Sequence, residues 1–291
     1  MGVTLLHSQQ TETIKLKTSE ISYTVYGEGK PILIINGGPG MNSDGFETIA
    51  KTLSKTHQAI IYDQRGTGRS EIDIINRSTM TMELMLRDIE TIRTHLNIES
   101  WIIFGHSFGG MLGSFYASKF PERVSAMILS SSGGMDLSLL RSLDIRSALT
   151  ETQQDSLAFW TQKINNGDST YQTRYQRGKY LAPAYLYDQS LVNVVAHRLT
   201  QGNMQINSLI WQDMQRINFD CKNQLKSFTK PVLIIQGKQD IIDKSIAQTA
   251  DKVFQNSTLV YVDKSAHYGW LEQPELYFDS VNLFLSNLAS K

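Results

Sequence analysis

Five consecutive residues, Gly105-His106-Ser107-Phe108-Gly109, form the pattern in this sequence that points most directly to a chemistry. Glycine two residues before and two residues after a serine is typical of a sharp turn between a strand and a helix, which exposes the serine hydroxyl for attack on a carbonyl. The glycines suit this turn because the serine backbone is strained and a side chain at either flank would collide across it. The pattern predicts that Ser107 is a nucleophile.

An acid and a histidine follow Ser107 in the order that a serine triad on a parallel sheet requires. Asp240 and His267 each come shortly after a short apolar run that is typical of a buried strand. Reactive side chains in open α/β sheets gather beyond the carboxyl ends of the strands, so we expect these three residues to meet. His267 would act as the base and Asp240 as the acid that orients it, with Asp243 as the fallback acid.

Acyl transfer also needs N–H donors for the negative charge of its transition state. The backbone amide of Phe108, directly after the serine, supplies one donor. The glycine-rich segment 36–40 follows an earlier predicted strand, and Gly38 is its best candidate because a residue without a side chain lets the backbone approach the oxyanion. Segment 36–40 could also be an ordinary turn. We favour an oxyanion hole made by Gly38 and Phe108.

Alternating strands and helices surround these residues and predict an α/β fold with a mostly parallel, doubly wound sheet. Apolar runs typical of buried strands occupy 31–35, 59–62, 101–104, 126–129, 231–235 and 259–262. Apolar residues at helical spacing predict amphipathic helices around 46–53, 85–96, 111–116 and 281–288. Residues 12–26 alternate as an antiparallel pair of strands would.

The alternation stops between residues 134 and 227, where polar segments dotted with aromatic residues replace the apolar strands. We interpret 134–227 as a mainly helical cap inserted into a core made of 1–133 and 228–291. A separate helical domain is the alternative. The insertion explains better why the α/β pattern resumes afterwards.

The composition argues against nucleic acid and membranes as partners. Lysine plus arginine and aspartate plus glutamate number 28 each, so the formal net charge is zero and no long-range field favours nucleic acid or an anionic membrane. The sequence has no stretch of about 20 apolar residues and no signal-peptide core near its start, so we expect a cytoplasmic protein that does not span a membrane. We expect a small molecule or short peptide as substrate, and the sequence leaves the oligomeric state open.

Neither a metal nor another cofactor is expected, because no His, Cys and Asp cluster shows ligand spacing. The single cysteine, Cys221, cannot form an internal disulfide. No nucleophile motif surrounds it, and we interpret it as a spectator thiol.

The sequence resembles the α/β-hydrolase superfamily and, within it, the proline iminopeptidases. Besides the serine turn, Gly37-Gly38-Pro39-Gly40 and Asp63-Gln64-Arg65-Gly66-Thr67-Gly68-Arg69-Ser70 carry the resemblance. It covers the two predicted core blocks, about 12–134 and 228–289. The resemblance implies an enzyme that removes an N-terminal residue, often proline, from short peptides.

The sequence departs from the family at three places. Asn36 stands where the family usually has histidine, and His106 and Phe108 give the serine turn a form that is also common in esterases and lipases. An aminopeptidase must also pair the substrate ammonium with a carboxylate, and the family takes it chiefly from cap glutamates. This cap has a single glutamate, Glu151, and its other acids are aspartates such as Asp155, Asp188, Asp213 and Asp220.

The leading functional hypothesis is a serine hydrolase of the proline iminopeptidase type, acting on small peptides or amides. The alternative is a carboxylesterase or lactonase, for which Phe108, Trp160 and Trp211 would suit an apolar acyl group. The least favoured reading is a non-catalytic small-molecule-binding protein, which would have no need of all three triad residues. Epoxide hydrolases and haloalkane dehalogenases normally carry aspartate at the position of Ser107.

Overall fold

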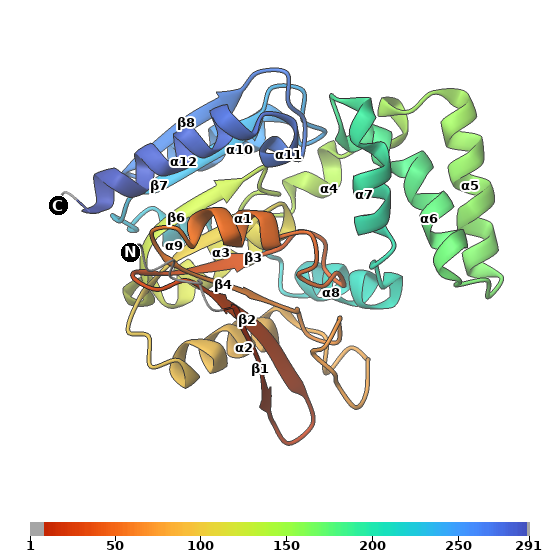
Figure 1. Cartoon of the computed structure of the whole chain (residues 1–291). Helices are drawn as coiled ribbons and strands as arrows, with labels where there is room; N and C mark the ends of the chain where they lie inside the picture. Colours follow the sequence, from red (N-terminus) through yellow and green to blue (C-terminus); the bar gives the residue numbers. More distant parts are fainter. Residues whose placement is uncertain (1–8, 290–291) are drawn as a thin grey trace, which may run out of the picture.

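The computed structural model describes residues 9–289. These residues form one eight-stranded sheet (Figure 1). Its strands are β1 (Gln9–Lys15), β2 (Glu20–Tyr26), β3 (Pro31–Ile35), β4 (Gln58–Tyr62), β5 (Trp101–His106), β6 (Val124–Ser130), β7 (Val232–Gly237) and β8 (Ser257–Val262). The order across the sheet is β1-β2-β4-β3-β5-β6-β7-β8. The strands β3 to β8 are parallel to one another, while β2 is antiparallel to both β1 and β4.

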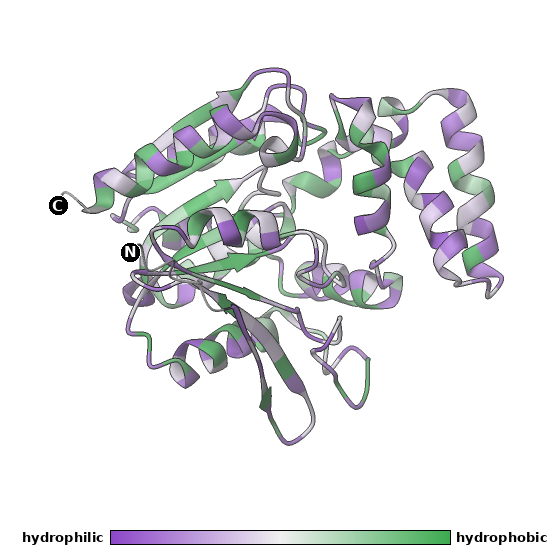
Figure 2. Cartoon of the chain, in the orientation of Figure 1, coloured by the Kyte–Doolittle hydropathy of each residue, from purple (hydrophilic) through white to green (hydrophobic). Residues whose placement is uncertain are grey.

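Helices cover both faces of the sheet because the inner strands are apolar on both sides. On β3, Leu33 and Ile35 pack on one face, and Ile32 and Ile34 pack on the other. The first face lies under α2 (Met82–His95), α3 (Phe108–Lys119) and α10 (Lys244–Val253), and the second under α1 (Glu47–Leu53) and α12 (Pro274–Ala289). Figure 2 shows the hydrophobic residues concentrated on these strands. The predicted doubly wound α/β sheet is confirmed.

The boundaries agree with the sequence patterns to within about two residues at most ends. The segment 12–26 contains the antiparallel pair β1 and β2, and 31–35 is β3. The strand predicted over 231–235 begins one residue later and continues to Gly237. The last helix buries Val281 and Leu285 against the sheet, as its spacing predicts.

Residues 134–227 contain only helices among their described regular elements, apart from one isolated bridge between Asp136 and Asp220. We call 134–227 the inserted segment. Its helices are α4 (Ser138–Ser142), α5 (Glu151–Asn165), α6 (Tyr171–Leu181), α7 (Val192–Leu199), α8 (Met204–Arg216) and α9 (Lys222–Leu225). Figure 1 shows α5 and α6 farthest from the sheet. The division into core and cap stays a prediction, and residues 1–8 and 290–291 of the predicted core lie outside the described residues.

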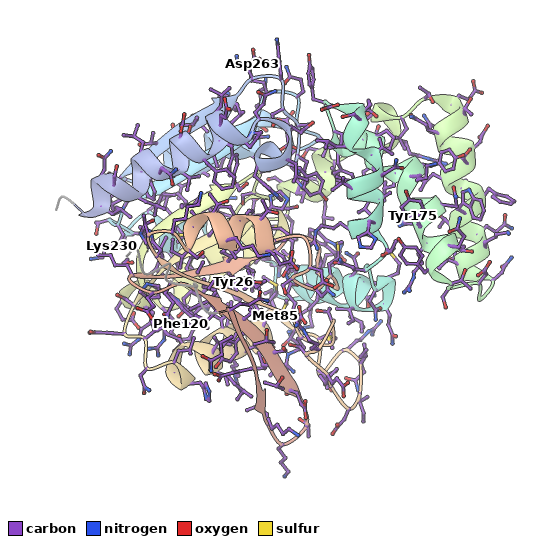
Figure 3. The ribbon with its side chains drawn as sticks, in the orientation of Figure 1. Tyr26, Met85, Phe120, Tyr175, Lys230 and Asp263 are labelled. Carbon is purple, nitrogen blue, oxygen red and sulfur yellow. The ribbon has the colours of Figure 1, made fainter. Side chains whose placement is uncertain are left out.

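Two parts of the inserted segment differ in their packing. The helices α6 and α7 approach closely at Gly178, where a methyl group would lie 2.6 Å from the carbonyl oxygen of Ala196. Tyr175 on α6 (Figure 3) donates a hydrogen bond to Asn193 near the start of α7, at 3.0 Å. In contrast, α8 packs directly on the core, since Ile206, Ile210 and Met214 belong to the apolar cluster under α2 and α3.

Candidate active site

Ser107 occupies a strained turn between β5 and α3. Its backbone has φ 54° and ψ −120°, a conformation that costs a non-glycine residue about 1–3 kcal/mol. The turn is held by hydrogen bonds from the Ser107 N–H to the Ser130 carbonyl and from the Gly133 N–H to the Ser107 carbonyl, each 3.0 Å long.

Both glycines of the turn are required by close packing. A methyl group on Gly105 would lie 2.5 Å from the carbonyl oxygen of Gly109, and a methyl group on Gly109 would collide with the carbonyl oxygen of Ile35 on β3. The helix α3 therefore begins directly against the sheet, and Ser107 lies at the carboxyl end of β5.

The structure brings Asp240 and His267 together. Asp240 follows β7 and His267 follows β8, and their side chains are 0% and 5% exposed. His267 Nδ1 lies 2.9 Å from Asp240 Oδ1, which also accepts a hydrogen bond from the Ile242 N–H at 3.0 Å. A carboxylate can only accept, so Nδ1 carries a proton, and in the neutral imidazole Nε2 is then the acceptor. Asp243 instead caps α10 by accepting from the Ser245 N–H at 2.8 Å.

His106 connects the serine turn with this pair. The ring centroids of His106 and His267 are 4.6 Å apart. His106 is buried, and its Nδ1 lies 3.1 Å from the Ser130 carbonyl oxygen, to which it donates because a carbonyl only accepts. Burial holds the pKa of His106 well below its ordinary value, and electrostatic interactions with His267 and Arg198 act in the same direction. His106 therefore stays neutral.

The glycine-rich loop lies beside the serine. A methyl group on Gly37 would be 2.9 Å from Cβ of Ser107. Gly38 has φ +76°, and a methyl group there would meet the side chain of Met41, whose N–H bonds to the Gly38 carbonyl at 3.1 Å. Phe108 opens α3, in the first turn, where N–H groups have no acceptor within the helix. The loop and the first turn of α3 thus both adjoin Ser107.

Asn36, which replaces the expected histidine, is buried and folds this loop on itself. Its Nδ2 donates to the carbonyl oxygens of Gly37 at 3.1 Å and Met41 at 2.9 Å. The backbone carbonyl oxygen of Asn36 accepts from Gln64 Nε2 at 2.9 Å. Asn36 is therefore a polar anchor at the start of the loop.

The segment from Asp63 to Ser70 is hydrogen-bonded to neighbouring parts of the core. Asp63 is buried; its Oδ1 accepts from the N–H and the hydroxyl of Ser43 at 2.9 and 2.7 Å, and its Oδ2 accepts from the Arg69 N–H at 2.9 Å. The Ser70 hydroxyl accepts from the Ser22 N–H at 2.8 Å. This motif therefore has a structural explanation that does not require it to touch a substrate.

The sequence patterns missed Arg198, a buried arginine on α7. Its guanidinium donates to the carbonyl oxygens of Asn42 at 3.3 Å, Gly37 at 3.4 Å and Asp44, and it lies 4.7 Å from the ring centre of Phe46. No carboxylate among residues 9–289 lies within ion-pair distance of it. Burial lowers the pKa of the guanidinium. No local pattern marks this residue, since the carbonyl groups that it binds are about 160 positions away.

A second missed residue is Glu272, which ends the short helix α11 (Gly269–Glu272). It is buried and contacts backbone groups on both the His267 loop and the inserted segment. In the sequence, this residue is marked only by being an acid that ends the short apolar run after His267.

The five cap acids considered as ammonium anchors have other surroundings. Glu151 and Asp155 are exposed on α5, and Asp188 caps a short turn. Asp213 is buried, accepting from the Met82 N–H at 2.8 Å and pairing with Arg216, while Asp220 lies 3.1 Å from Lys222. Among the described residues, none of the five forms a hydrogen bond or ion pair with Ser107, Asp240 or His267.

The aromatic residues proposed for an acyl pocket separate into two groups. The rings of Phe108 and Trp211 are neighbours, with centroids 6.4 Å apart. Trp160 instead packs against Phe159 at 5.2 Å and lies under the ammonium of Lys163 on α5. Only the first pair adjoins the serine turn.

Residues 9–289 contain no group of three or more His, Cys, Asp or Glu side chains arranged to hold a metal ion. No helix in the same range has the length and apolar character needed to cross a membrane.

Comparison with known proteins places the chain in a family. The profile of the alpha/beta hydrolase fold family matches residues 30–274. A proline iminopeptidase of Lactobacillus acidophilus is 34% identical over 284 residues, covering 91% of this chain and 94% of its own. A proline iminopeptidase of Heyndrickxia coagulans is 26% identical and covers 90% and 92% of the two chains.

Solved structures agree on the fold. An alpha/beta fold family hydrolase from Bacillus anthracis has a TM-score of 0.78 at 21% identity, covering 95% of this chain and 99% of that one. A meta-cleavage product hydrolase has a TM-score of 0.74 at 22% identity, covering 95% and 98%. The chain belongs to the α/β-hydrolase family. It is a hydrolase, and within the family its sequence is proline iminopeptidase-like.

Proposed function

We propose that this hydrolase uses Ser107 as its nucleophile, His267 as general base and Asp240 as the group that orients the imidazole. The observation that carries the proposal is the 2.9 Å contact between His267 Nδ1 and Asp240 Oδ1, at the strand ends beside the strained serine turn. This contact fixes the tautomer whose Nε2 can accept a proton.

In the proposed reaction, His267 Nε2 takes the proton of the Ser107 hydroxyl as Oγ attacks the acyl carbon. The tetrahedral oxyanion accepts hydrogen bonds from the N–H groups of Phe108 and Gly38, each worth about 3–4 kcal/mol in comparable sites. His267 then gives the proton to the leaving group. A water molecule, activated by the same imidazole, releases the acyl group from Ser107.

The preferred substrate is a small peptide or amide with a free N-terminus, as for a proline iminopeptidase. Support comes from relatives of that name that match about nine tenths of the chain, including the inserted segment, and not from the serine turn alone. The Asp63–Ser70 motif and the glycine-rich loop strengthen the likeness.

A carboxylesterase or lactonase acting on small apolar acyl substrates is the second candidate, and two observations favour it. The five cap acids are exposed or already engaged. Arg198 also places an unpaired buried positive charge against the glycine-rich loop. A buried ammonium without a carboxylate partner is costly, whereas a neutral ester needs none.

One substrate panel separates these candidates. Prolyl and alanyl arylamides, their N-acetylated forms and short-chain aryl esters are each given to the wild type and to Ser107→Ala. Turnover of the free-amine arylamides that is lost on acetylation supports the peptidase, and turnover of esters alone supports the esterase. Binding without turnover would leave the non-catalytic reading. Activity that survives in Ser107→Ala contradicts the serine mechanism.

A further inference from the structure

Glu272 is a buried acid that no cation neutralises. It is 8% exposed, and no lysine, arginine or histidine among residues 9–289 lies within ion-pair distance of it. Burial raises the pKa of its carboxyl, while hydrogen bonds from backbone N–H groups act in the opposite direction. A buried carboxylate without a cation is costly, so its stability depends on the hydrogen bonds that it accepts.

Each carboxylate oxygen of Glu272 binds a different part of the chain. Oε2 accepts from the Ala266 N–H at 2.6 Å and from the Ser265 hydroxyl at 3.4 Å. Oε1 accepts from the N–H groups of Tyr187 at 2.6 Å and Asp188 at 2.9 Å, both in the inserted segment. One carboxylate thus joins the loop that carries His267 to a segment about 80 residues earlier.

The backbone of His267 joins the same two parts. Its N–H donates to the carbonyl oxygen of Tyr185 at 3.1 Å, and the two rings lie 5.4 Å apart. The contacts of Glu272 therefore flank this bond on both sides, at residues 265–266 and 187–188.

We infer that Glu272 is a positioning residue that fixes the backbone of His267 and couples it to the inserted segment through Tyr187 and Asp188. The inference rests on the proposed role of His267 as base. Small displacements of such a group are costly, since an error of about 1 Å can lower a rate about 100-fold.

The carboxylate is needed because all four of its partners donate. Glutamine has the same shape but only one acceptor oxygen, so its NH₂ group would face an N–H on one of the two sides. Glu272→Gln should therefore release either 265–266 or 187–188. Glu275→Gln, the same change at an exposed position on α12, is the matched control.

Two measurements are made on the full chain. For the substrate that the wild type turns over best, Glu272→Gln should lower kcat about tenfold or more and change KM by less than about twofold. Hydrogen exchange should accelerate at the amides of 265–267 or at those of 187–188, on the side that the glutamine NH₂ group faces, while the amides of β5 keep their wild-type rates. Glu275→Gln should match the wild type in both.

The inference is overturned if the amides of 265–267 and of 187–188 all exchange as in the wild type, if acceleration extends equally to β5, or if kcat stays within about twofold in an active enzyme. If the wild type shows no hydrolysis, the proposed function fails, and the exchange result alone then decides the role of Glu272.

A second pair of variants covers a failure of Glu272→Gln to fold. Asp188→Pro removes one N–H donor at a residue whose φ of −84° is close to that of proline, while Asp188→Ala keeps the N–H and removes only the side chain. Lower kcat and faster His267 amide exchange in Asp188→Pro than in Asp188→Ala support the coupling. Equal values for the two variants refute it.

Discussion

At the scale of single residues, surroundings decide what two aspartates three positions apart can do. The side chain of Asp240 is fully buried and accepts from His267 Nδ1, whereas Asp243 accepts from the N–H of Ser245 and caps α10. The sequence favours Asp240 because it directly follows the turn after β7. It leaves Asp243 open because both follow the same strand.

Asp240→Asn should lower kcat about 10⁴-fold with little change in KM, because the amide NH₂ can donate to Nδ1 and stabilise the wrong imidazole tautomer. Asp243→Asn is the matched control, and it should retain activity within about twofold because asparagine is an equally good helix cap. Steady-state kinetics on one substrate test both. An Asp240→Asn enzyme that keeps more than about a tenth of wild-type kcat would contradict the assignment.

Cys221 illustrates a reactive residue type made inert by its site. Burial, followed by the nearby charge of Asp220, raises the pKa of the thiol to about 12. At about pH 8 the native thiol should therefore resist iodoacetamide, since the thiolate is the reacting form. Mass spectrometry should show alkylation only after unfolding in urea. Rapid alkylation of the folded protein with loss of activity would show that Cys221 is not a spectator.

At the scale of elements, the contact between α3 and β3 depends on glycine. Gly109→Ala should lower the free energy of unfolding by about 3 kcal/mol or more, because its methyl group meets the backbone oxygens of Ile35 and Asn36. In Gly202→Ala the methyl group lies 3.7 Å from its nearest contact, so the change should stay within about 0.5 kcal/mol. Urea unfolding of both variants provides the test, and equal stabilities would refute this packing.

Asp213 links α8 to the start of α2. We expect Asp213→Asn to lower the free energy of unfolding by about 1–2 kcal/mol, because it weakens the bonds to the Met82 N–H and to Arg216. The KM for free-amine arylamides should not change. Asp155→Asn, on the exposed side of α5, should leave both quantities unchanged. A higher KM for free-amine substrates alone would instead identify Asp213 as the ammonium anchor.

The elements of the sheet are predictable because each one has a local signal. The inner strands are short apolar runs buried on both faces, and the helices place their apolar residues at a spacing of 3.6. The roles of Arg198 and Glu272 are not predictable in this way. The contacts that connect them to distant parts of the chain are made with backbone groups about 80 to 160 positions away, and a backbone group leaves no trace in the sequence.

At the scale of the whole molecule, the inserted segment contacts both sides of the site. Arg198, the Asn203 N–H and Asn207 bond to the loop that contains Gly38, while Tyr185 bonds to the N–H of His267. The inserted segment therefore binds both the glycine-rich loop and the loop that carries the proposed base. Ser107, Asp240 and His267 could be placed from the order of strands, but these connections depend on the folded insertion.

The most direct test of the account is the covalent reaction of Ser107 itself. The wild type is incubated with a fluorophosphonate, and the adduct is located by mass spectrometry of its peptides, alongside Ser107→Ala. We expect one adduct per chain, on Ser107, forming in step with the loss of hydrolysis, and neither adduct nor hydrolysis in Ser107→Ala. Modification at another residue that accompanies inactivation, or hydrolysis that persists in Ser107→Ala, would contradict the central claim.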